Sequence, residues 1–299
     1  MQVEQVVKSI GIFFAAFFVS ELGLFSLQAL GESNTSAAGL QEAPAVQEIL
    51  ELQEVPVLQT APAQEPAAPK AAVTLSVNIE AGQTTTLFSL DADKKLPVAS
   101  LTKLMTALVA LQNYEVTDPI IISAEAMAIE GEQGSLKLGE TLPVKSLLRI
   151  MLMESSNRAA YALAERIGVD PFIIDMNETA QSLGLENTHF VDSSGLSADS
   201  FSTAADIAML TQHLFEHQPL FGEMISLPAY DLYVNDVLHH TLINTNQLLG
   251  SLGVVGGKTG YTDIAKGCLM AIQKTAVGYN IHVVLGAEDR FGEVEKLIK

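Results

Sequence analysis

Three short motifs in this 299-residue chain carry residue types that could do chemistry together. They are Ser100-Leu101-Thr102-Lys103, Ser155-Ser156-Asn157 and Lys258-Thr259-Gly260. Each pattern occurs by chance in many proteins. Jointly they supply a nucleophile, amines that can take its proton, and groups that can hold a substrate carboxylate. Such a set is the equipment of serine acyl transfer without a catalytic histidine.

The first motif pairs a serine with a lysine one helical turn away. Ser100 needs a base, because a serine hydroxyl is too weakly acidic to attack a carbonyl unaided. Lys103 lies on the same face of the helix that apolar spacing predicts over 100–112. Burial, or a nearby cation such as Lys258, would depress the pKa of its amine. Because 96–99 indicates an extended entry, Ser100 is expected near a helix start, where backbone N–H groups favour an oxyanion. A serine cap with a surface lysine is the alternative.

The second motif stands between two apolar segments that predict helices. Three small polar residues in that position indicate a tight loop or a helix cap, which needs no function. As chemistry, the Ser155 hydroxyl could relay a proton between Lys103 and a leaving amine. The Asn157 amide could bond a peptide backbone or the Lys103 amine.

The third motif lies in a glycine-rich strand pattern over 254–262. Lys258 and Thr259 could supply a charge and a hydroxyl for a carboxylate. Glycines inside a strand often mark close approach of a ligand or another backbone, and a substrate strand lying alongside would explain them. A glycine-rich turn is the alternative.

The elements that must bring these motifs together fall into two groups. Strand patterns stand at both ends of the folded part: 74–79, 84–90, 253–262, 267–275 and 279–286. Residues 143 to about 249 indicate mostly helix, and Thr203 with Asp206 marks one helix start by a capping hydroxyl and an acid. We therefore predict an α/β (α+β) fold. Both ends of the domain form an antiparallel sheet flanked by helices, with an inserted, mostly helical subdomain and the active site in the cleft between them.

The amino-acid composition limits the kinds of molecule that this protein is expected to bind. The apolar fraction of 48% is enough for a sizeable core, and the net charge is −19, from 35 acidic and 16 basic residues. This charge argues against nucleic acid and against a polybasic contact with anionic lipid. The single cysteine, Cys268, excludes an intramolecular disulfide, and the six histidines show no HExxH pattern. We predict no metal and no cofactor.

The amino terminus differs in kind from the rest of the chain. Lys8 precedes the apolar run 10–19, which Ser20 and Glu21 interrupt before 22–30 resumes it. We predict that 1–31 is a signal peptide or an N-terminal membrane anchor, with an internal core helix as the alternative.

The next stretch, 32–72, is rich in Pro, Ala, Gln and Glu with few aromatic residues, which predicts a disordered linker. The catalytic domain is then expected to span 73–299.

The order and surroundings of the motifs resemble those of the serine-type D-alanyl-D-alanine carboxypeptidases. These are the low-molecular-weight penicillin-binding proteins of peptidase family S11, in the beta-lactamase/transpeptidase-like superfamily. The likeness extends over roughly 73–299. Beyond the motifs it includes these stretches: 97–107, 134–140, 192–196, 202–206 and 244–249.

The resemblance implies roles for the first two motifs. Ser100 would be the acylated nucleophile and Lys103 its base. Ser155 and Asn157 would form the second catalytic motif.

It also implies a set of substrate-binding residues: Lys258, Thr259, Gly260, Tyr261 and Arg290. The first three would line the strand that docks the substrate. The backbone N–H groups of Ser100 and Tyr261 would bind the oxyanion, and Arg290 would lie near the substrate's terminal carboxylate.

The function that the resemblance implies is removal of the terminal D-alanine from peptidoglycan stem pentapeptides through an acyl-enzyme on Ser100. β-Lactams would inhibit it. The enzyme would be exported, to the outer face of the bacterial cytoplasmic membrane, the cell wall or the periplasm. The alternatives are a D,D-endopeptidase that cuts cross-links, a class A-like β-lactamase, and a catalytically idle wall-binding homologue. The β-lactamase would need a glutamate in an E-x-x-L-N context, and no such stretch lies between Asn157 and Lys258.

Two departures from the family pattern bear on these expectations. Arg158 stands where the family usually has an acid, which would alter a salt bridge at the rim of the site. The chain also stops soon after Arg290, whereas many relatives continue into a β-rich domain and an amphipathic membrane helix. The amino-terminal segment is therefore the expected anchor.

Overall fold

The computed structural model describes residues 67–131 and 133–299. The chain divides into two units at Glu65 and Pro66, and all the described helices and strands belong to the second, Pro66–Lys299. The predicted signal peptide or anchor, 1–31, and the predicted linker up to residue 66 lie outside the described residues.

One five-stranded antiparallel sheet joins the two ends of the second unit. Its strand order is β2-β1-β11-β10-β9. The bounds are Ala71–Asn78 for β1, Gln83–Leu90 for β2, Val254–Thr262 for β9, Lys266–Lys274 for β10 and Gly278–Ala287 for β11. The pairing of β1 with β11 confirms a sheet built from both termini. β1 begins two residues before the expected domain start, because Ala71 and Ala72 are buried and pair with Leu285 and Val284.

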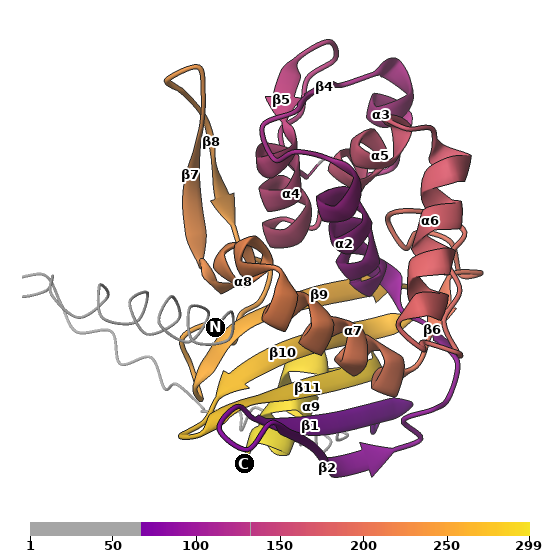
Figure 1. Ribbon diagram of the computed structural model, residues 1–299, viewed down its shortest axis with the longest axis vertical. Helices are drawn as coiled ribbons and strands as arrows, with labels where there is room; N and C mark the ends of the chain where they lie inside the picture. Colours follow the sequence, from indigo (N-terminus) through magenta and orange to yellow (C-terminus); the bar gives the residue numbers. More distant parts are fainter. Residues whose placement is uncertain (1–66, 132) are drawn as a thin grey trace, which may run out of the picture. The chain divides into compact units, whose positions relative to one another are not determined.

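Helices cover the sheet and form the inserted part. They are η1 Ala99–Thr102, α2 Lys103–Asn113, α3 Ala124–Ala128, α4 Val144–Met153, α5 Asn157–Glu165, α6 Val169–Ser182, α7 Ala204–His217, α8 Pro219–Ser226 and α9 Arg290–Ile298. Figure 1 shows α7 across one face of the sheet and α9 behind the other, while α2, α4, α5 and α6 stand above. The predicted mixed fold is confirmed.

Helix starts follow the capping chemistry of the sequence. The Thr203 side chain accepts a hydrogen bond from the Asp206 backbone N–H at the start of α7, as predicted. At the start of α5, the Ser156 side chain accepts a hydrogen bond from the Ala159 backbone N–H. The helix predicted over 100–112 begins as the 3₁₀ turn η1 and continues as α2. Every residue of α2 up to Ala110 is buried, which makes it the central helix of the core.

Short strands lie both before and within the block, 143 to about 249, that was expected to be mostly helical. β3 (Leu96–Pro97) pairs with β6 (Phe201–Ser202), and β4 (Pro119–Ile121) with β5 (Thr141–Pro143). The hairpin of β7 (Ala229–Val234) and β8 (Val237–Ile243) contradicts a mostly helical segment to 249. Its two turn residues, Asn235 and Asp236, both have positive φ, of 50° and 63°. Such residues favour a tight hairpin turn, so the signal was present in the sequence.

The close pairing of β1 with β11 requires a glycine at 278. A Cβ there would lie 2.0 Å from the Val77 carbonyl oxygen, and backbone cannot yield as a flexible side chain can. We expect Gly278→Ala to lower the free energy of unfolding in urea by about 2–3 kcal/mol. The matched control is Gly222→Ala in α8, where a Cβ would make an ordinary contact of 3.4 Å with the Phe215 ring. Equal stability of the two variants would contradict this account of the sheet.

Candidate active site

Ser100 lies in η1, where the chain passes from β3 into α2. Ala99 before it has a φ of 48°, so the turn is tight. The turn packs directly on β9, because a Cβ on Gly260 would lie only 3.0 Å from the Ser100 backbone nitrogen. Gly260 thus permits backbone-to-backbone contact between the first and third motifs. Ser100 and Gly260, 160 positions apart, become neighbours through this packing.

Lys103 is the first residue of α2, and its side chain is fully buried. Its amine donates to Ser100 Oγ (2.9 Å), Asn157 Oδ1 (2.7 Å) and the Ser194 carbonyl oxygen (2.6 Å). Burial lowers the pKa of Lys103 to about 7, although the negative charge of Asp192 opposes this shift. Near neutral pH much of the amine is therefore uncharged, which is the state that a base requires.

Lys258 on β9 is the second buried lysine, with an exposed fraction of 1%. Its amine donates to Ser155 Oγ (2.7 Å) and to the Thr259 carbonyl oxygen (2.8 Å). Burial, and then the positive charges of Lys103 and Arg290, hold its pKa well below the ordinary value. The contact with Ser155 differs from the expected one, in which the Ser155 hydroxyl served Lys103.

The second motif occupies the junction between α4 and α5. Ser155 has a φ of 65°. Ser156 caps α5 and donates to the Gln133 carbonyl oxygen (2.7 Å). Asn157 uses both ends of its amide: Oδ1 accepts from Lys103, and Nδ2 donates to the Glu130 carbonyl oxygen (2.9 Å). Arg158, at the position of the usual acid, donates from Nε to the Ile129 carbonyl oxygen (3.2 Å).

The remaining predicted residues lie on or behind β9, which is an edge strand of the sheet. Thr259 is buried, and its hydroxyl lies 2.7 Å from that of Thr245. Tyr261 is 57% exposed. Arg290, at the start of α9, donates from Nη1 to the Gly260 carbonyl oxygen (3.0 Å).

Two glycines of β9 are closely packed against other residues of the protein. A Cβ on Gly256 would meet the Ile225 side chain at 2.8 Å. One on Gly257 would meet Asn246 Nδ2 at 2.5 Å and the Met270 carbonyl oxygen at 2.6 Å. The backbone contact therefore excludes a larger residue at Gly257, whereas at Gly256 the Ile225 side chain would have to shift.

The polar partners of Lys103 and Thr259 include two residues that were not among the predicted ones. The Ser194 carbonyl binds Lys103, and the Thr245 hydroxyl contacts Thr259. Both lie in the stretches 192–196 and 244–249 that resemble the family. Their sequence context could have marked them, but the direction of a backbone carbonyl is not encoded in residue type.

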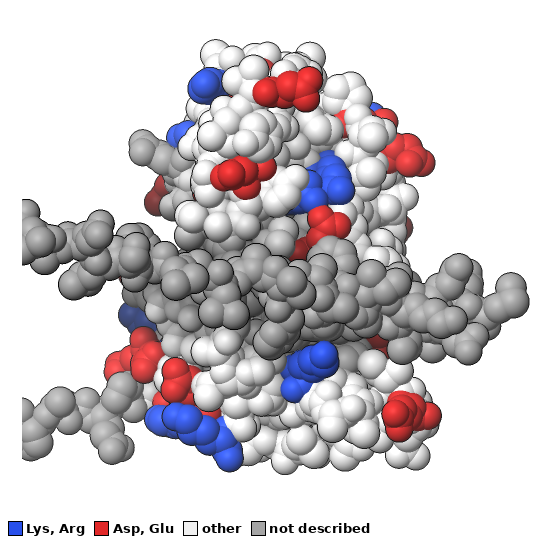
Figure 2. Space-filling view, turned by 90° about the vertical axis from the view of Figure 1, so that its left-hand side faces the viewer, with Lys and Arg blue, Asp and Glu red and all other residues white. Residues whose placement is uncertain are grey.

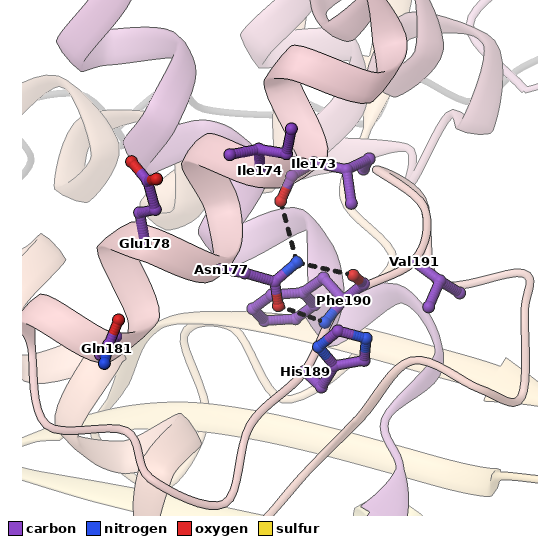
Figure 3. Close-up of a pocket in the computed structure, with 8 residues that line it drawn as sticks. All are labelled: Ile173, Ile174, Asn177, Glu178, Gln181, His189, Phe190 and Val191. Carbon is purple, nitrogen blue, oxygen red and sulfur yellow. Dashed lines mark hydrogen bonds between the residues drawn. The ribbon is translucent and has the colours of Figure 1, made fainter.

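A depression of about 460 Å³ lies apart from these residues, between α6 and the segment 189–191. Figure 3 shows Asn177 at its centre, bonded to the backbone of Ile173 and Phe190. None of the predicted site residues lines it. On the face in Figure 2, acidic and basic side chains of described residues are interspersed rather than gathered by sign.

Two kinds of feature are absent from the described residues. In 67–131 and 133–299, no helix is long and apolar enough to cross a membrane. Within the same part of the chain, no group of three or more His, Cys, Asp or Glu side chains is placed to hold a metal ion.

Comparisons with known proteins give a consistent family. The model of the Peptidase S11 family, described as D-alanyl-D-alanine carboxypeptidase, matches residues 60–289. The D-alanyl-D-alanine carboxypeptidase DacF of Bacillus subtilis is 33% identical over 235 residues, which are 75% of this chain and 60% of DacF. The D-alanyl-D-alanine endopeptidase of Escherichia coli K12 is 31% identical over 75% of this chain and 74% of its own length. This chain therefore spans less than two thirds of the DacF length.

Solved structures of similar proteins agree with this family. Penicillin-binding protein D2 from Listeria monocytogenes, in its ampicillin-bound form, has a TM-score of 0.68 and 32% identity. The match covers 77% of this chain and 96% of that one. A Streptomyces DD-transpeptidase has a TM-score of 0.71 and 29% identity, covering 77% of this chain and 95% of that one.

The buried Lys103 amine makes stability depend on pH. In the unfolded chain it titrates near its ordinary pKa of 10.5, and in the folded protein near 7. Between these values the unfolded chain binds more protons, so the stability contributed by Lys103 rises as pH increases through this window and is lowest below it. We expect Lys103→Met to reduce the slope of unfolding free energy against pH between about pH 7 and about pH 9, by up to about 1.4 kcal/mol per pH unit.

Urea unfolding across this pH range measures the slope. Lys94→Met is the control, because Lys94 is exposed and pairs only loosely with Asp91 at 3.6 Å. An unchanged slope in Lys103→Met would show that the buried amine keeps its ordinary pKa.

Proposed function

The chain belongs to the D-alanyl-D-alanine carboxypeptidase family, peptidase S11, and on this premise we propose that it removes the terminal D-alanine from peptidoglycan stem pentapeptides. Ser100 is the proposed nucleophile and forms an acyl-enzyme. One observation carries the proposal: the Ser100 hydroxyl lies 2.9 Å from a fully buried lysine amine whose pKa is about 7. A serine in this environment has a base within reach at neutral pH.

The proposed acylation begins with neutral Lys103. A neutral amine has two N–H groups and one lone pair. Asn157 Oδ1 and the Ser194 carbonyl can accept the two hydrogens, which leaves the lone pair for the Ser100 hydroxyl. Ser100 Oγ then attacks the carbonyl carbon of the D-alanyl-D-alanine bond as its proton moves to Lys103 Nζ. We propose the backbone N–H groups of Ser100 and Tyr261 as the oxyanion donors.

The second half of the step releases D-alanine. As the C–N bond breaks, the leaving amine needs a proton. Because Ser155 Oγ is bonded to Lys258 Nζ at 2.7 Å, we propose that the proton reaches the amine from Ser155, which is resupplied by Lys258. We propose that water then attacks the ester carbonyl and gives its proton through Ser155 to Lys258. Lys103 returns its proton to Ser100 Oγ as the ester C–O bond breaks, which restores both lysines. In acylation, therefore, the Ser100 proton moves to Lys103, whereas the proton for the leaving amine comes from Lys258 through Ser155.

Substrate binding is assigned to β9 and α9. We propose that Lys258 and Thr259 bind the terminal carboxylate of the peptide, since an ammonium and a hydroxyl both donate to carboxylates. Gly260 and Tyr261 would flank the docked peptide at this open edge of the sheet. Arg290 contributes positive charge near the strand and holds it through the Gly260 carbonyl.

We propose that the protein acts outside the cytoplasm, at the cell wall. The support is the apolar run of 10–19 with Lys8 before it, which has the pattern of an export segment. The segment 1–31 would serve as a signal peptide or as the membrane anchor, with the residues from 32 up to the start of β1 at Ala71 as a linker. β-Lactams are the proposed inhibitors, because a similar penicillin-binding protein is known in ampicillin-bound form.

A D,D-endopeptidase is the second candidate, because the Escherichia coli relative that this chain matches over 74% of its length is named an endopeptidase. It would use the same nucleophile and base on a cross-linked peptide. Chromatography of digested cell wall after incubation separates the two activities. Loss of pentapeptides indicates a carboxypeptidase, and loss of cross-linked dimers indicates an endopeptidase.

Acylation tests the nucleophile directly. Incubation with penicillin is expected to add the mass of one β-lactam to the intact protein, and Ser100→Ala is expected to abolish this addition together with D-alanine release. Ser182→Ala is the control, because its hydroxyl lies at the exposed end of α6 and bonds only the Thr179 carbonyl. A wild-type protein that is neither acylated nor releases D-alanine would refute the proposed function.

A further inference from the structure

Asp192 begins a turn, residues 192–200, between α6 and β6, and organises it. Its Oδ1 accepts hydrogen bonds from the Ser194 backbone N–H (2.6 Å), the Ser194 hydroxyl (2.9 Å) and the Gly195 N–H. Its Oδ2 accepts from the Ser197 N–H (2.9 Å) and the Ser200 hydroxyl (3.3 Å). Five donors converge on one carboxylate, so the turn is folded around Asp192.

The turn presents two backbone carbonyls to α2. The Ser193 carbonyl accepts from Thr106 Oγ1 (2.6 Å), and the Ser194 carbonyl accepts from Lys103 Nζ (2.6 Å). On its other side the turn touches η1. Gly195 has a φ of 81°, and a Cβ there would lie 1.9 Å from the Ala99 carbonyl oxygen. The turn therefore fits between the nucleophile's turn and the helix that bears the base.

The chain entering the turn is held separately. Asn177 of α6 donates to the Phe190 carbonyl (2.8 Å) and accepts from the Phe190 N–H (2.9 Å), as the dashed lines in Figure 3 show. This anchors the segment up to Val191. The shape of the turn beyond that point depends on Asp192.

We propose that Asp192 is a positioning residue for Lys103, acting through the Ser194 carbonyl that it holds against the lysine amine. The inference rests on the proposed function, in which Lys103 is the base for Ser100. Asp192 itself makes no contact with Ser100 among the hydrogen bonds of its carboxylate.

The orientation of a neutral amine explains why such positioning matters. With two acceptors in place, Asn157 Oδ1 and the Ser194 carbonyl, the lone pair of Lys103 is directed to the Ser100 hydroxyl. If the Ser194 carbonyl moved away, an N–H of Lys103 would turn toward Ser100 Oγ, and the lone pair would point elsewhere. Acylation would then slow even though both catalytic side chains remained.

Charge gives Asp192 a second effect on the same amine. Its carboxylate raises the pKa of Lys103, against the larger lowering by burial. The other charge facing this amine is Lys258 on β9, which itself faces Arg290 of α9. The pKa of Asp192 lies below its ordinary value: burial alone would raise it, but its hydrogen bonds with Ser197, Ser194 and Gly195 outweigh that effect. It therefore stays charged wherever Lys103 titrates.

The test is the rate of penicillin acylation of the full chain as a function of pH, for wild type, Asp192→Asn, Asp192→Glu and Asp199→Asn. Asp192→Asn removes the charge and one acceptor. We expect its rate at the plateau to fall about tenfold, the effect of one misplaced hydrogen bond. We also expect the midpoint of its acidic limb to move to lower pH, because Lys103 then loses its proton more easily.

Two variants separate charge from geometry. Asp192→Glu keeps the charge but displaces it, so the midpoint should stay near that of wild type while the plateau rate falls. Asp199→Asn is the matched control: Asp199 lies in the same turn, makes no bond to Lys103, and should leave both quantities unchanged. If Asp192→Asn matches wild type in both quantities, or loses rate without moving the midpoint, the proposal is overturned. If Asp192→Asn does not fold, Asp192→Glu decides, and an unchanged plateau rate in that variant rejects the proposal.

Direct titration of Lys103 distinguishes this inference from the proposed function. The ¹³Cε resonance of Lys103, assigned by its loss in Lys103→Met, reports the amine without any acylation. If wild type is not acylated but this titration moves to lower pH in Asp192→Asn, the proposed function fails while the effect of Asp192 on the Lys103 amine stands. If wild type is acylated and the titration does not move, the role of Asp192 fails alone.

Discussion

The burial of two lysine amines within one site constrains everything that is packed around them. An ammonium removed from water is costly unless its hydrogens find acceptors, and two in one site repel each other. Lys103 and Lys258 meet this constraint differently. The Lys103 amine donates to three acceptors from three separate segments. The Lys258 amine donates to the Ser155 hydroxyl and to the Thr259 carbonyl of its own strand. The pKa of each amine lies below its ordinary value, so the site holds less positive charge than two lysines would suggest.

The fold supplies these acceptors from parts of the chain that are far apart. The sheet joins both ends of the domain, which places β9 beside η1. The junction of α4 and α5 brings Ser155 to Lys258 and Asn157 to Lys103. The 192–200 turn closes the remaining side. Glycines at 195 and 260 permit these approaches, because a Cβ at either would meet backbone of the Ser100 turn. The catalytic arrangement is thus a consequence of backbone packing as much as of side-chain chemistry.

Membership of the D-alanyl-D-alanine carboxypeptidase family sets the class of chemistry, and local contacts distinguish this chain within it. Arg158 replaces the usual acid after Asn157, yet its guanidinium bonds the Ile129 carbonyl and leaves both contacts of Asn157 in place. Relatives that this chain resembles are named both carboxypeptidases and endopeptidases. The proposed nucleophile and base, Ser100 and Lys103, fit either name, because the two reactions differ in the leaving group and not in how the serine would be activated.

From the amino-acid sequence alone we could predict the motifs, the strands at both ends, the helix starts at Thr203 and near Ser100, and the family. These depend on residue type and short spacing, which local propensity and capping chemistry decide. The folded structure was needed to show that Ser155 binds Lys258, that the Ser194 carbonyl accepts from Lys103, and that Gly256 and Gly257 of β9 pack against other residues of the protein. These contacts depend on the directions of backbone carbonyls and on the distances between residues that are far apart in the sequence. The spacing between residues 103, 155, 194 and 258 encodes neither. The β7–β8 hairpin lies between these two groups. Its turn residues, Asn235 and Asp236, are typical of a hairpin, but the sequence around them was interpreted as mostly helical.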